Sequence, residues 1–226
     1  MGYIKDNIDD IKQQIPSGVE LVAVSKTHPS EYIKEAYECG QRIFGENKVQ
    51  ELVSKHEELK EYDIKWHLIG HLQTNKVKYI AEFVDLIHSV DSLKLLKEIS
   101  KQAKKHNRVI DCLLQFYIAS EETKFGLSFD EAVGILDSEE YQKLENVRIV
   151  GVMGMASFVN DEEIIKQEFS NLKIMFENIK KDYFKEENSF CEISMGMSSD
   201  WKLAVKSGST LIRVGSIIFG NRNYNI

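Results

Sequence analysis

Short apolar runs with the composition of β-strands alternate with charged, helix-like segments from one end of this chain to the other. Eight such runs predict strands, at residues 21–25, 42–45, 67–70, 86–90, 109–118, 148–155, 191–197 and 211–214. The segments between them include several with the apolar spacing of amphipathic helices, at residues 30–39, 48–59, 92–106 and 161–183. Strands that alternate with helices along a chain predict a parallel sheet covered by helices.

This alternation fits two architectures, a closed (β/α)8 barrel and a doubly wound open sheet. Eight strands, each followed by a helix, is the number that closes a barrel. No predicted strand leads into the Gly-x-Gly-x-x-Gly turn of dinucleotide-binding open sheets. We therefore predict a single (β/α)8 TIM-type barrel domain over residues 1–226, with an extra N-terminal helix at about residues 2–14. The chain has only two prolines and no Gly/Ser-rich linker, so no domain boundary is expected.

Composition and charge exclude several classes of function. A net charge of −7, with no block of basic residues, argues against nucleic acid as the main partner. No apolar run approaches the about 20 residues of a membrane-spanning helix, and the acidic N-terminus is unlike a targeting peptide. The three cysteines are far apart and include no Cys-x-x-Cys pair, so we expect neither a disulfide framework nor a zinc site. A cytoplasmic protein is predicted.

The first predicted strand ends in Ser25-Lys26-Thr27. In a barrel the functional groups lie at the C-terminal ends of the strands, and polar residues and glycines gather there in this sequence. Alternation places Val22, Val24 and Lys26 on one face, so Lys26 enters the barrel mouth if the valines face the axis. An amine in an apolar site is more easily uncharged, which favours Schiff-base formation with an aldehyde. The alternative is a solvated lysine or one paired with a carboxylate.

The last two predicted strands end in residues that suit an anion. Barrel phosphate sites are most often built from the loops after strands seven and eight. Those loops supply hydroxyl groups, a guanidinium and a glycine that permits close backbone approach, from Ser198, Ser199, Arg213, Gly215 and Ser216. The alternatives are a helix N-cap for the serines and an ion pair between Arg213 and Glu192. Together with the strand-one lysine, these loops predict a phosphorylated aldehyde cofactor.

Three other polar residues lie at predicted strand ends. Asn47 could contact the same ligand or cap the next helix. His67 and His71 are four residues apart in a strand–loop context, which is not a metal-ligand geometry, and no cluster of ligands completes a site nearby. No bound metal is expected.

Longer motifs give the chain a resemblance to a known family. They are Leu21-Val-Ala-Val-Ser-Lys-Thr27, Phe44-Gly-Glu-Asn47, Trp66-His-Leu-Ile-Gly-His-Leu-Gln-Thr-Asn-Lys76, Glu121-Glu-Thr-Lys-Phe-Gly126, Ser194-Met-Gly-Met-Ser-Ser-Asp200 and Ile212-Arg-Val-Gly-Ser216, followed by Ile218-Phe-Gly220. Through them the chain resembles, from about residue 19 to residue 224, the pyridoxal phosphate homeostasis proteins. These are barrel proteins with a fold similar to the N-terminal barrel of alanine racemase.

The resemblance implies that Lys26 carries pyridoxal 5′-phosphate as an internal aldimine. It implies that Arg213 lies beside the cofactor, that Asn47 and Met195 line its ring, and that the phosphate is held by Ser198, Ser199, Gly215 and Ser216. The implied role is control of intracellular pyridoxal phosphate and of amino- and keto-acid balance. Two positions depart from the family's usual sequence. They are Tyr117, where an amide is usual, and Gly154, where threonine or alanine is usual.

Two alternatives to a cofactor carrier are a pyridoxal-phosphate-dependent amino-acid racemase and a phosphosugar enzyme with an aldolase-type lysine. Racemisation needs an acid and a base on opposite faces of the cofactor, and in two-domain racemases a second β-domain contributes to that pair. The sequence ends soon after the eighth predicted strand, so we expect no second β-domain. We therefore expect a carrier without a known turnover, a monomer or weak dimer, that passes its cofactor to apoenzymes.

Overall fold

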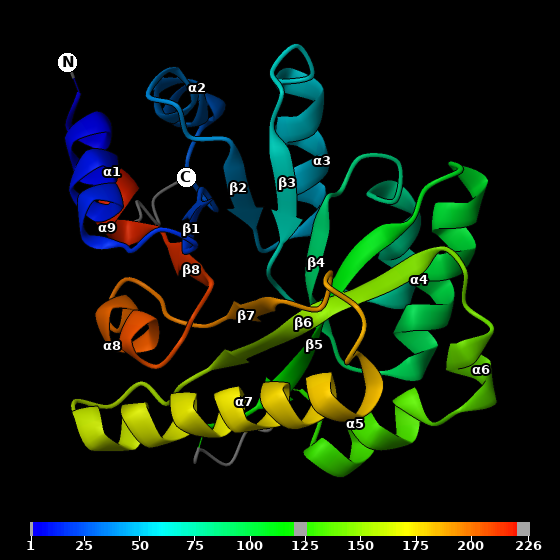
Figure 1. Ribbon diagram of the computed structural model, residues 1–226. Helices are drawn as coiled ribbons and strands as arrows, with labels where there is room; N and C mark the ends of the chain where they lie inside the picture. Colours follow the sequence, from blue (N-terminus) through cyan, green and yellow to red (C-terminus); the bar gives the residue numbers. More distant parts are fainter. Residues whose placement is uncertain (1, 120–125, 221–226) are drawn as a thin grey trace.

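The computed structural model describes residues 2–119 and 126–220, and in it the strands form a closed barrel (Figure 1). The strands follow one another around the barrel in chain order and pair in parallel. Their bounds are β1 (Glu20–Val24), β2 (Ile43–Glu46), β3 (Lys65–Leu68), β4 (Leu86–Val90), β5 (Ile110–Tyr117), β6 (Val147–Met155), β7 (Glu192–Ser194) and β8 (Leu211–Val214). The predicted barrel is confirmed.

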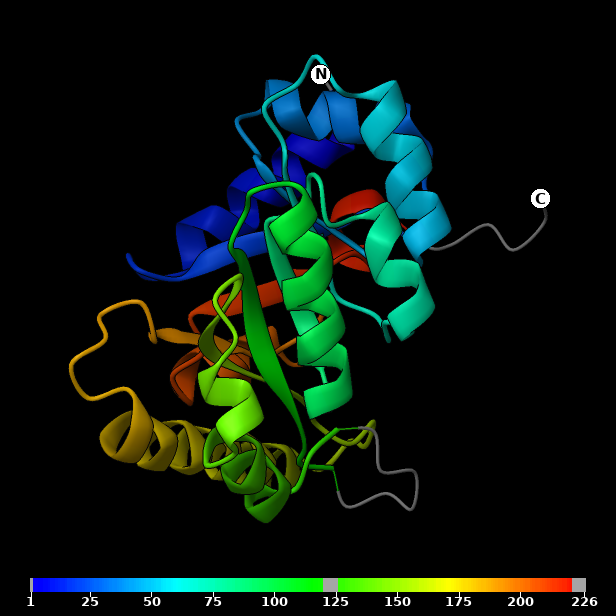
Figure 2. The same cartoon turned by 90° about the vertical axis from the view of Figure 1, so that its right-hand side faces the viewer.

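Helices form an outer layer around this barrel. Among them, α3 packs on β2 and β3, α4 on β5 and β6, α7 on β6, and α8 on β8 (Figure 2). The bounds are α1 (Tyr3–Gln14), α2 (Ser30–Glu38), α3 (Val49–Glu58), the 3-10 helix η1 (Thr74–Tyr79), α4 (Leu93–Lys105), α5 (Phe129–Leu136), α6 (Glu139–Gln142), α7 (Glu162–Tyr183), α8 (Trp201–Lys206) and α9 (Ser216–Phe219). Within the described ranges, no helix combines the length and the apolar character that crossing a membrane requires.

Most predicted strands lie within a few residues of the observed ones. The largest difference is the seventh, predicted at residues 191–197 and observed only at Glu192–Ser194. Gly196 has a φ of 93°, a left-handed conformation that ends the extended backbone early. Helix α5 had no predicted bounds, although its start carries a capping box: the Ser128 hydroxyl accepts from the Glu131 N–H, and the Glu131 carboxylate accepts from the Ser128 N–H.

Two apolar clusters separate the inside of the barrel from its helical shell. The smaller cluster takes residues from six strands and therefore fills the barrel interior, with Val22, Ile43, Leu86, Leu113, Val150, Met153 and Leu211. The larger cluster lies between the strands and the helices, and it includes Leu21 and Ala23. The alternation predicted for the first strand is therefore confirmed, because Val22 faces inward while its neighbours face the helices.

The predicted helix ahead of the first strand is present as α1, and it packs beside α2 and α9 (Figure 1). The Tyr3 hydroxyl donates to the Phe219 carbonyl over 3.0 Å, and the Asn7 amide donates to the Ile218 carbonyl over 3.2 Å. These contacts tie the last described helix to the first. They thereby fix the segment that follows β8, where part of the predicted site lies.

Candidate functional site

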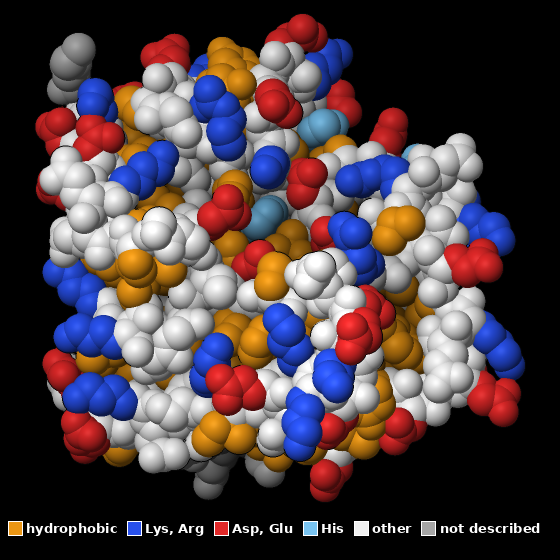
Figure 3. Space-filling model, viewed as in Figure 1, with side chains coloured by type: hydrophobic (Ala, Val, Ile, Leu, Met, Phe, Trp, Pro, Cys, Tyr) orange, Lys and Arg blue, Asp and Glu red, His pale blue; other side chains and the backbone are white. Residues whose placement is uncertain are grey.

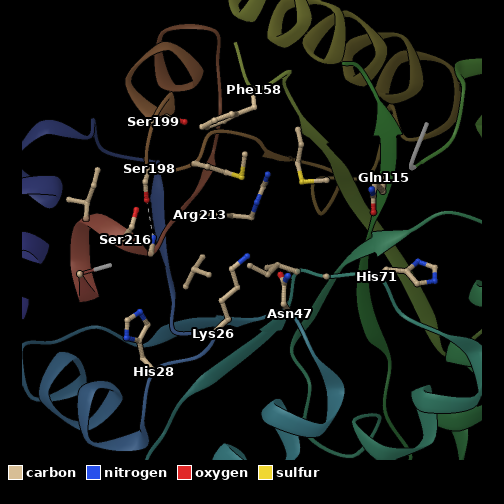
Figure 4. Close-up of a pocket in the computed structure, with 18 of the residues that line it drawn as sticks. Lys26, His28, Asn47, His71, Gln115, Phe158, Ser198, Ser199, Arg213 and Ser216 are labelled. Atoms are coloured by element: carbon tan, nitrogen blue, oxygen red, sulfur yellow. Dashed lines mark hydrogen bonds between the residues drawn. The ribbon is translucent and has the colours of Figure 1, made fainter. Parts of the chain in front are cut away.

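A cavity of about 720 Å³ opens at the C-terminal ends of the barrel strands. This is the end at which barrel proteins carry their functional groups, and the volume suits a small-molecule ligand. The cavity joins residues that are far apart in the chain, from the loop after β1 to the loop after β8. The predicted site residues that line it are Lys26, Asn47, Ser198, Ser199, Arg213, Gly215 and Ser216 (Figure 4).

Lys26 enters this cavity because it continues the inward face of β1. Val24 lines the cavity wall, as the alternation predicts, and the side chain of Lys26 points into the space that Asn47 also lines (Figure 4). Thr27, the next residue, has a φ of 67°. A left-handed conformation is unusual for a β-branched residue, so neighbouring groups must hold the backbone at this turn.

Ser198 and Gly215 join the loops after β7 and β8. The Gly215 N–H donates to Ser198 Oγ over 3.3 Å (Figure 4). A Cβ on Gly215 would lie 2.9 Å from the carbonyl oxygen of Val24, so a glycine is what lets this loop approach the first strand. Ser199 and Ser216 are exposed at the same edge of the cavity. Their hydroxyl groups can donate hydrogen bonds to a bound anion.

The serines at this edge are not helix caps. Helix α8 begins at Trp201, and its N-cap residue is Asp200. The Asp200 carboxylate accepts from the Met197 N–H over 2.5 Å, which closes the loop that carries Ser198 and Ser199. Burial raises the pKa of Asp200, and the nearby Arg213 opposes that rise. The alternative in which Ser198 or Ser199 caps the helix is therefore wrong.

Arg213 is a buried cation in the cavity wall, with 4% of its surface exposed. Its guanidinium donates to Ser194 Oγ over 2.5 Å and to the Gly154 carbonyl over 3.1 Å. The Glu192 carboxylate instead accepts from the Thr210 hydroxyl, so the alternative ion pair between Arg213 and Glu192 is wrong. Burial lowers the pKa of Arg213 to about 10, which leaves the group charged at neutral pH. A buried charge of this kind favours a polar or anionic ligand beside it.

Comparison with known proteins assigns the chain to a family. Residues 1–223 match the family model described as alanine racemase, N-terminal domain. The pyridoxal phosphate homeostasis protein of Aquifex aeolicus is 40% identical over 206 residues, which are 91% of this chain and 88% of that protein. The chain belongs to the pyridoxal phosphate homeostasis protein family. The member from Vibrio alginolyticus is 35% identical and matches over 100% of both chains.

Solved structures give the same result for the fold. PipY of Synechococcus elongatus without pyridoxal phosphate matches with a TM-score of 0.89 at 37% identity, and PipY with pyridoxal phosphate bound matches with 0.87 at 36%. Each match covers 96% of this chain and 100% of PipY. An alanine racemase of Clostridium difficile matches with a TM-score of 0.73 at 14% identity, and the chain spans 57% of it. That likeness shows a shared barrel fold alone.

A chain of buried polar groups runs from the cavity wall at Arg213 into the barrel interior. The sequence did not predict this network. Ser194 Oγ, which accepts from Arg213, lies 2.9 Å from His88 Nδ1. His88 Nε2 lies 3.0 Å from His67 Nδ1. Burial lowers the pKa of His67 to about 3 and the pKa of His88 well below its ordinary value. Both imidazoles are therefore neutral at physiological pH, and the network orients the guanidinium without adding charge.

The prediction that Met195 lines the site needs correction. Met195 is fully buried in the cluster between the barrel and the helices, and the methionines that line the cavity are Met155 and Met197. Because Ser194 faces inward to Arg213, alternation along β7 turns Met195 to the opposite side. His71 lies at the cavity mouth, with Nδ1 3.4 Å from an oxygen of Asp91. His67 instead lies inside the barrel, with Nδ1 3.0 Å from His88 Nε2.

The two departures from the family's usual sequence leave the cavity wall intact. Gln115 lines the cavity, whereas Tyr117 is half-buried and is not among the described residues that line it. A Cβ on Gly154 would lie 2.8 Å from Ile118 Cδ1 and 3.0 Å from Leu172 Cδ2, on the helix side of β6. Only the carbonyl of Gly154 reaches the site. Residues 120–125, with most of the motif that begins at Glu121, lie outside the described residues.

Proposed function

We propose that this protein binds pyridoxal 5′-phosphate through a Schiff base on Lys26, controls its free level and releases it to apoenzymes. The observation that carries the proposal is a single cavity lined by groups from both ends of the chain. The amine of Lys26 follows the first strand, and Arg213 and the Ser198–Gly215 pair come from the last two strands and their loops. The relatives named for pyridoxal phosphate homeostasis, and the PipY structure with that molecule bound, support it. A cytoplasmic location, a single domain and a monomer or weak dimer stay predictions.

The residues present fit this cofactor. Bound pyridoxal phosphate supplies an aldehyde, which condenses reversibly with a primary amine and releases water. Lys26 provides that amine inside the cavity, and Gly215 lets the loop after β8 pack close to the first strand. Ser198, Ser199 and Ser216 provide hydroxyl donors for a phosphate. Arg213, held by Ser194 and the Gly154 carbonyl, keeps a positive charge at the wall.

The rim of the cavity favours exchange of a ligand with the surroundings. Phe158 is 88% exposed, and Met155 and Ile217 are each 39% exposed, although all three line the cavity. A ligand held among such residues stays accessible from solvent and to a partner protein. Carbanion chemistry, as in a racemase, is helped by exclusion of water. The exposed rim therefore supports a carrier.

Absorbance spectroscopy with borohydride trapping tests the proposal. The purified protein should develop a visible band on titration with pyridoxal phosphate, and borohydride should convert it to a stable adduct on the peptide that contains Lys26. Mixing the loaded protein with an apoenzyme that needs pyridoxal phosphate should restore that enzyme's activity. An adduct on another residue, no transfer, or steady racemisation of an amino acid by the loaded protein would each contradict the proposal.

A serine variant should separate the phosphate contacts from the lysine. Ser198→Ala removes the acceptor of the Gly215 N–H and one hydroxyl donor of the cavity edge. We expect the affinity for pyridoxal phosphate to fall about tenfold, in line with the loss of one hydrogen bond to a charged group. The affinity for pyridoxal, which has no phosphate, should stay within about twofold. Ser54→Ala, on the exposed face of α3, is the control; equal losses for both ligands would argue against a phosphate contact.

A further inference from the structure

A buried polar cluster lies directly behind Lys26, between the barrel and α3. Lys26 faces the cavity, so Ser25 faces the opposite side of the sheet. There, Lys55 Nζ donates to the Ser25 carbonyl over 2.8 Å, to Glu46 Oε1 over 2.7 Å and to Glu51 Oε1 over 2.7 Å. The Ser25 hydroxyl also donates to Glu46 Oε1 over 2.7 Å. All three ammonium hydrogens of Lys55 are thus used, and two of the acceptors are side chains.

The same cluster holds the residue on the other side of Lys26. The Thr27 N–H donates to Glu51 Oε1 over 2.5 Å. Thr27 is the β-branched residue with a φ of 67°, a conformation that persists only where the surroundings impose it. Ser25 and Thr27 are therefore both bound to groups that Lys55 joins. Lys26 is the residue between them, and its backbone direction is fixed from both ends.

The charges of the cluster permit its burial. Glu46 is fully buried, and burial raises its pKa to about 7 against the opposing effect of Lys55. Glu46 Oε2 has no hydrogen-bond partner within the described part of the chain. When a proton occupies Glu46, Lys55 and Glu51 remain as one cation and one anion, and the cluster carries no net charge. Burial without net charge avoids the large cost of an unpaired buried ion.

We propose that Lys55, Glu46 and Glu51 form a clamp that positions Lys26, by holding Ser25 and Thr27 so that the lysine side chain points into the cavity. The reason for positioning Lys26 rests on the proposed function. The hydrogen bonds of the clamp do not, because they involve no ligand. Glu51 is the member that touches the strained residue, and 23% of its side chain is exposed. After a substitution there, the Glu46 carboxyl, 2.7 Å from Lys55 Nζ, remains to pair with the buried ammonium.

Substitutions at Glu51 test the clamp with two readouts. Glu51→Met removes the acceptor of the Thr27 N–H, whereas Glu51→Gln keeps an oxygen in its place. In Glu51→Met we expect labelling of Lys26 by acetic anhydride, measured by peptide mass spectrometry without pyridoxal phosphate, to rise about threefold as the turn loosens. Adduct formation with pyridoxal phosphate should weaken about tenfold, a loss of the size expected for one hydrogen bond with a charged acceptor. In Glu51→Gln both quantities should stay within about twofold of the wild type.

Matched variants make the outcome decisive. Glu57→Met makes the same change at an exposed position of the same helix and should match the wild type in both readouts. Glu51→Ala, which keeps a strong helix former, replaces Glu51→Met if that variant does not fold. The clamp is refuted if Glu51→Met behaves as Glu57→Met does, or if Glu51→Gln loses as much as Glu51→Met. A wild-type protein that fails to bind pyridoxal phosphate would refute the proposed function alone, because the labelling experiment needs no cofactor.

Discussion

Lys26→Ala is expected to abolish the borohydride-reducible adduct with pyridoxal phosphate. The alanine variant retains the loops after β7 and β8, with Ser198 Oγ still accepting from the Gly215 N–H. Some affinity should therefore persist through the phosphate contacts. The loss of the covalent bond should raise the dissociation constant at least about 100-fold, which corresponds to about 2.7 kcal/mol. Titration followed by absorbance, with mass spectrometry after reduction, measures both effects.

Two further lysine variants separate the amine from its charge. Lys26→Arg keeps a positive charge at the cavity but has no primary amine, so it should behave as Lys26→Ala in the reduction experiment. Lys48→Ala, at an exposed lysine just after β2, should keep the adduct and the affinity of the wild type. A reducible adduct that survives in Lys26→Ala and maps to another lysine would show that the reactive amine is elsewhere.

The features that the sequence could predict are those that depend on local periodicity. The strand ends, the inward face of β1 and the loops that contain Ser198 and Gly215 all follow from alternation and from the topology of a closed barrel. The same reasoning, applied one residue further, would have excluded Met195. Ser194 is the last residue of β7 and faces the barrel interior, where Arg213 donates to it, so its neighbour Met195 turns to the opposite side.

Long-range polar pairing could not be predicted in the same way. The chain from Arg213 through Ser194 and His88 to His67 joins residues of four different strands. Each of these residues has a place on a strand that periodicity can suggest. Which side chains meet inside the barrel depends on the stagger of all the strands between them. Sequence patterns of a single chain do not contain that stagger.

The charged residues show a similar limit to what the sequence can predict. Acidic and basic side chains are interspersed over the face drawn in Figure 3, and among the described residues visible there no continuous block of one sign forms. The sequence predicts this mixture because acidic and basic residues are both spread along the chain, with no long block of basic residues. It does not predict the clamp, in which Lys55 and Glu51 lie four residues apart on α3 like an ordinary surface ion pair. Only the fold places that pair beneath the turn that carries Lys26.

The free energy of unfolding is expected to fall as the pH is lowered from 6.5 to 5, through His67 and His88. Burial lowers the pKa of both imidazoles in the folded protein, to about 3 for His67. In the unfolded chain each binds a proton near pH 6.5. The unfolded state therefore gains protons first as the pH falls, and each imidazole lowers the stability by up to about 1.4 kcal/mol per pH unit.

Protonation of Glu46 has the opposite effect on the free energy of unfolding in the same pH range. Its pKa in the folded protein is raised to about 7, so the folded state binds this proton before the unfolded chain does. Lowering the pH from 7 toward 4.5 therefore stabilises the protein by up to about 1.4 kcal/mol per unit, which offsets one of the two imidazoles. Asp85 and Asp200, whose pKa values burial also raises, add a smaller effect of the same sign at lower pH. The net expectation for the wild type is a loss of about 1 kcal/mol per pH unit.

Urea unfolding at pH 6.5 and pH 5 of the wild type, His88→Asn and Glu46→Gln isolates the two contributions. His88→Asn should be less stable at neutral pH, because it disturbs the contacts with Ser194 and His67. Its stability should depend less on pH than that of the wild type, by about 1.4 kcal/mol per unit. Glu46→Gln should depend more steeply on pH than the wild type, because it removes the opposing effect of that carboxyl. An unchanged slope in His88→Asn would mean that this imidazole takes up its proton over the same pH range in the folded protein as in the unfolded chain, and so is charged at pH 5. The guanidinium of Arg213 would then have a cation within two hydrogen bonds, in place of the neutral network that the buried contacts require.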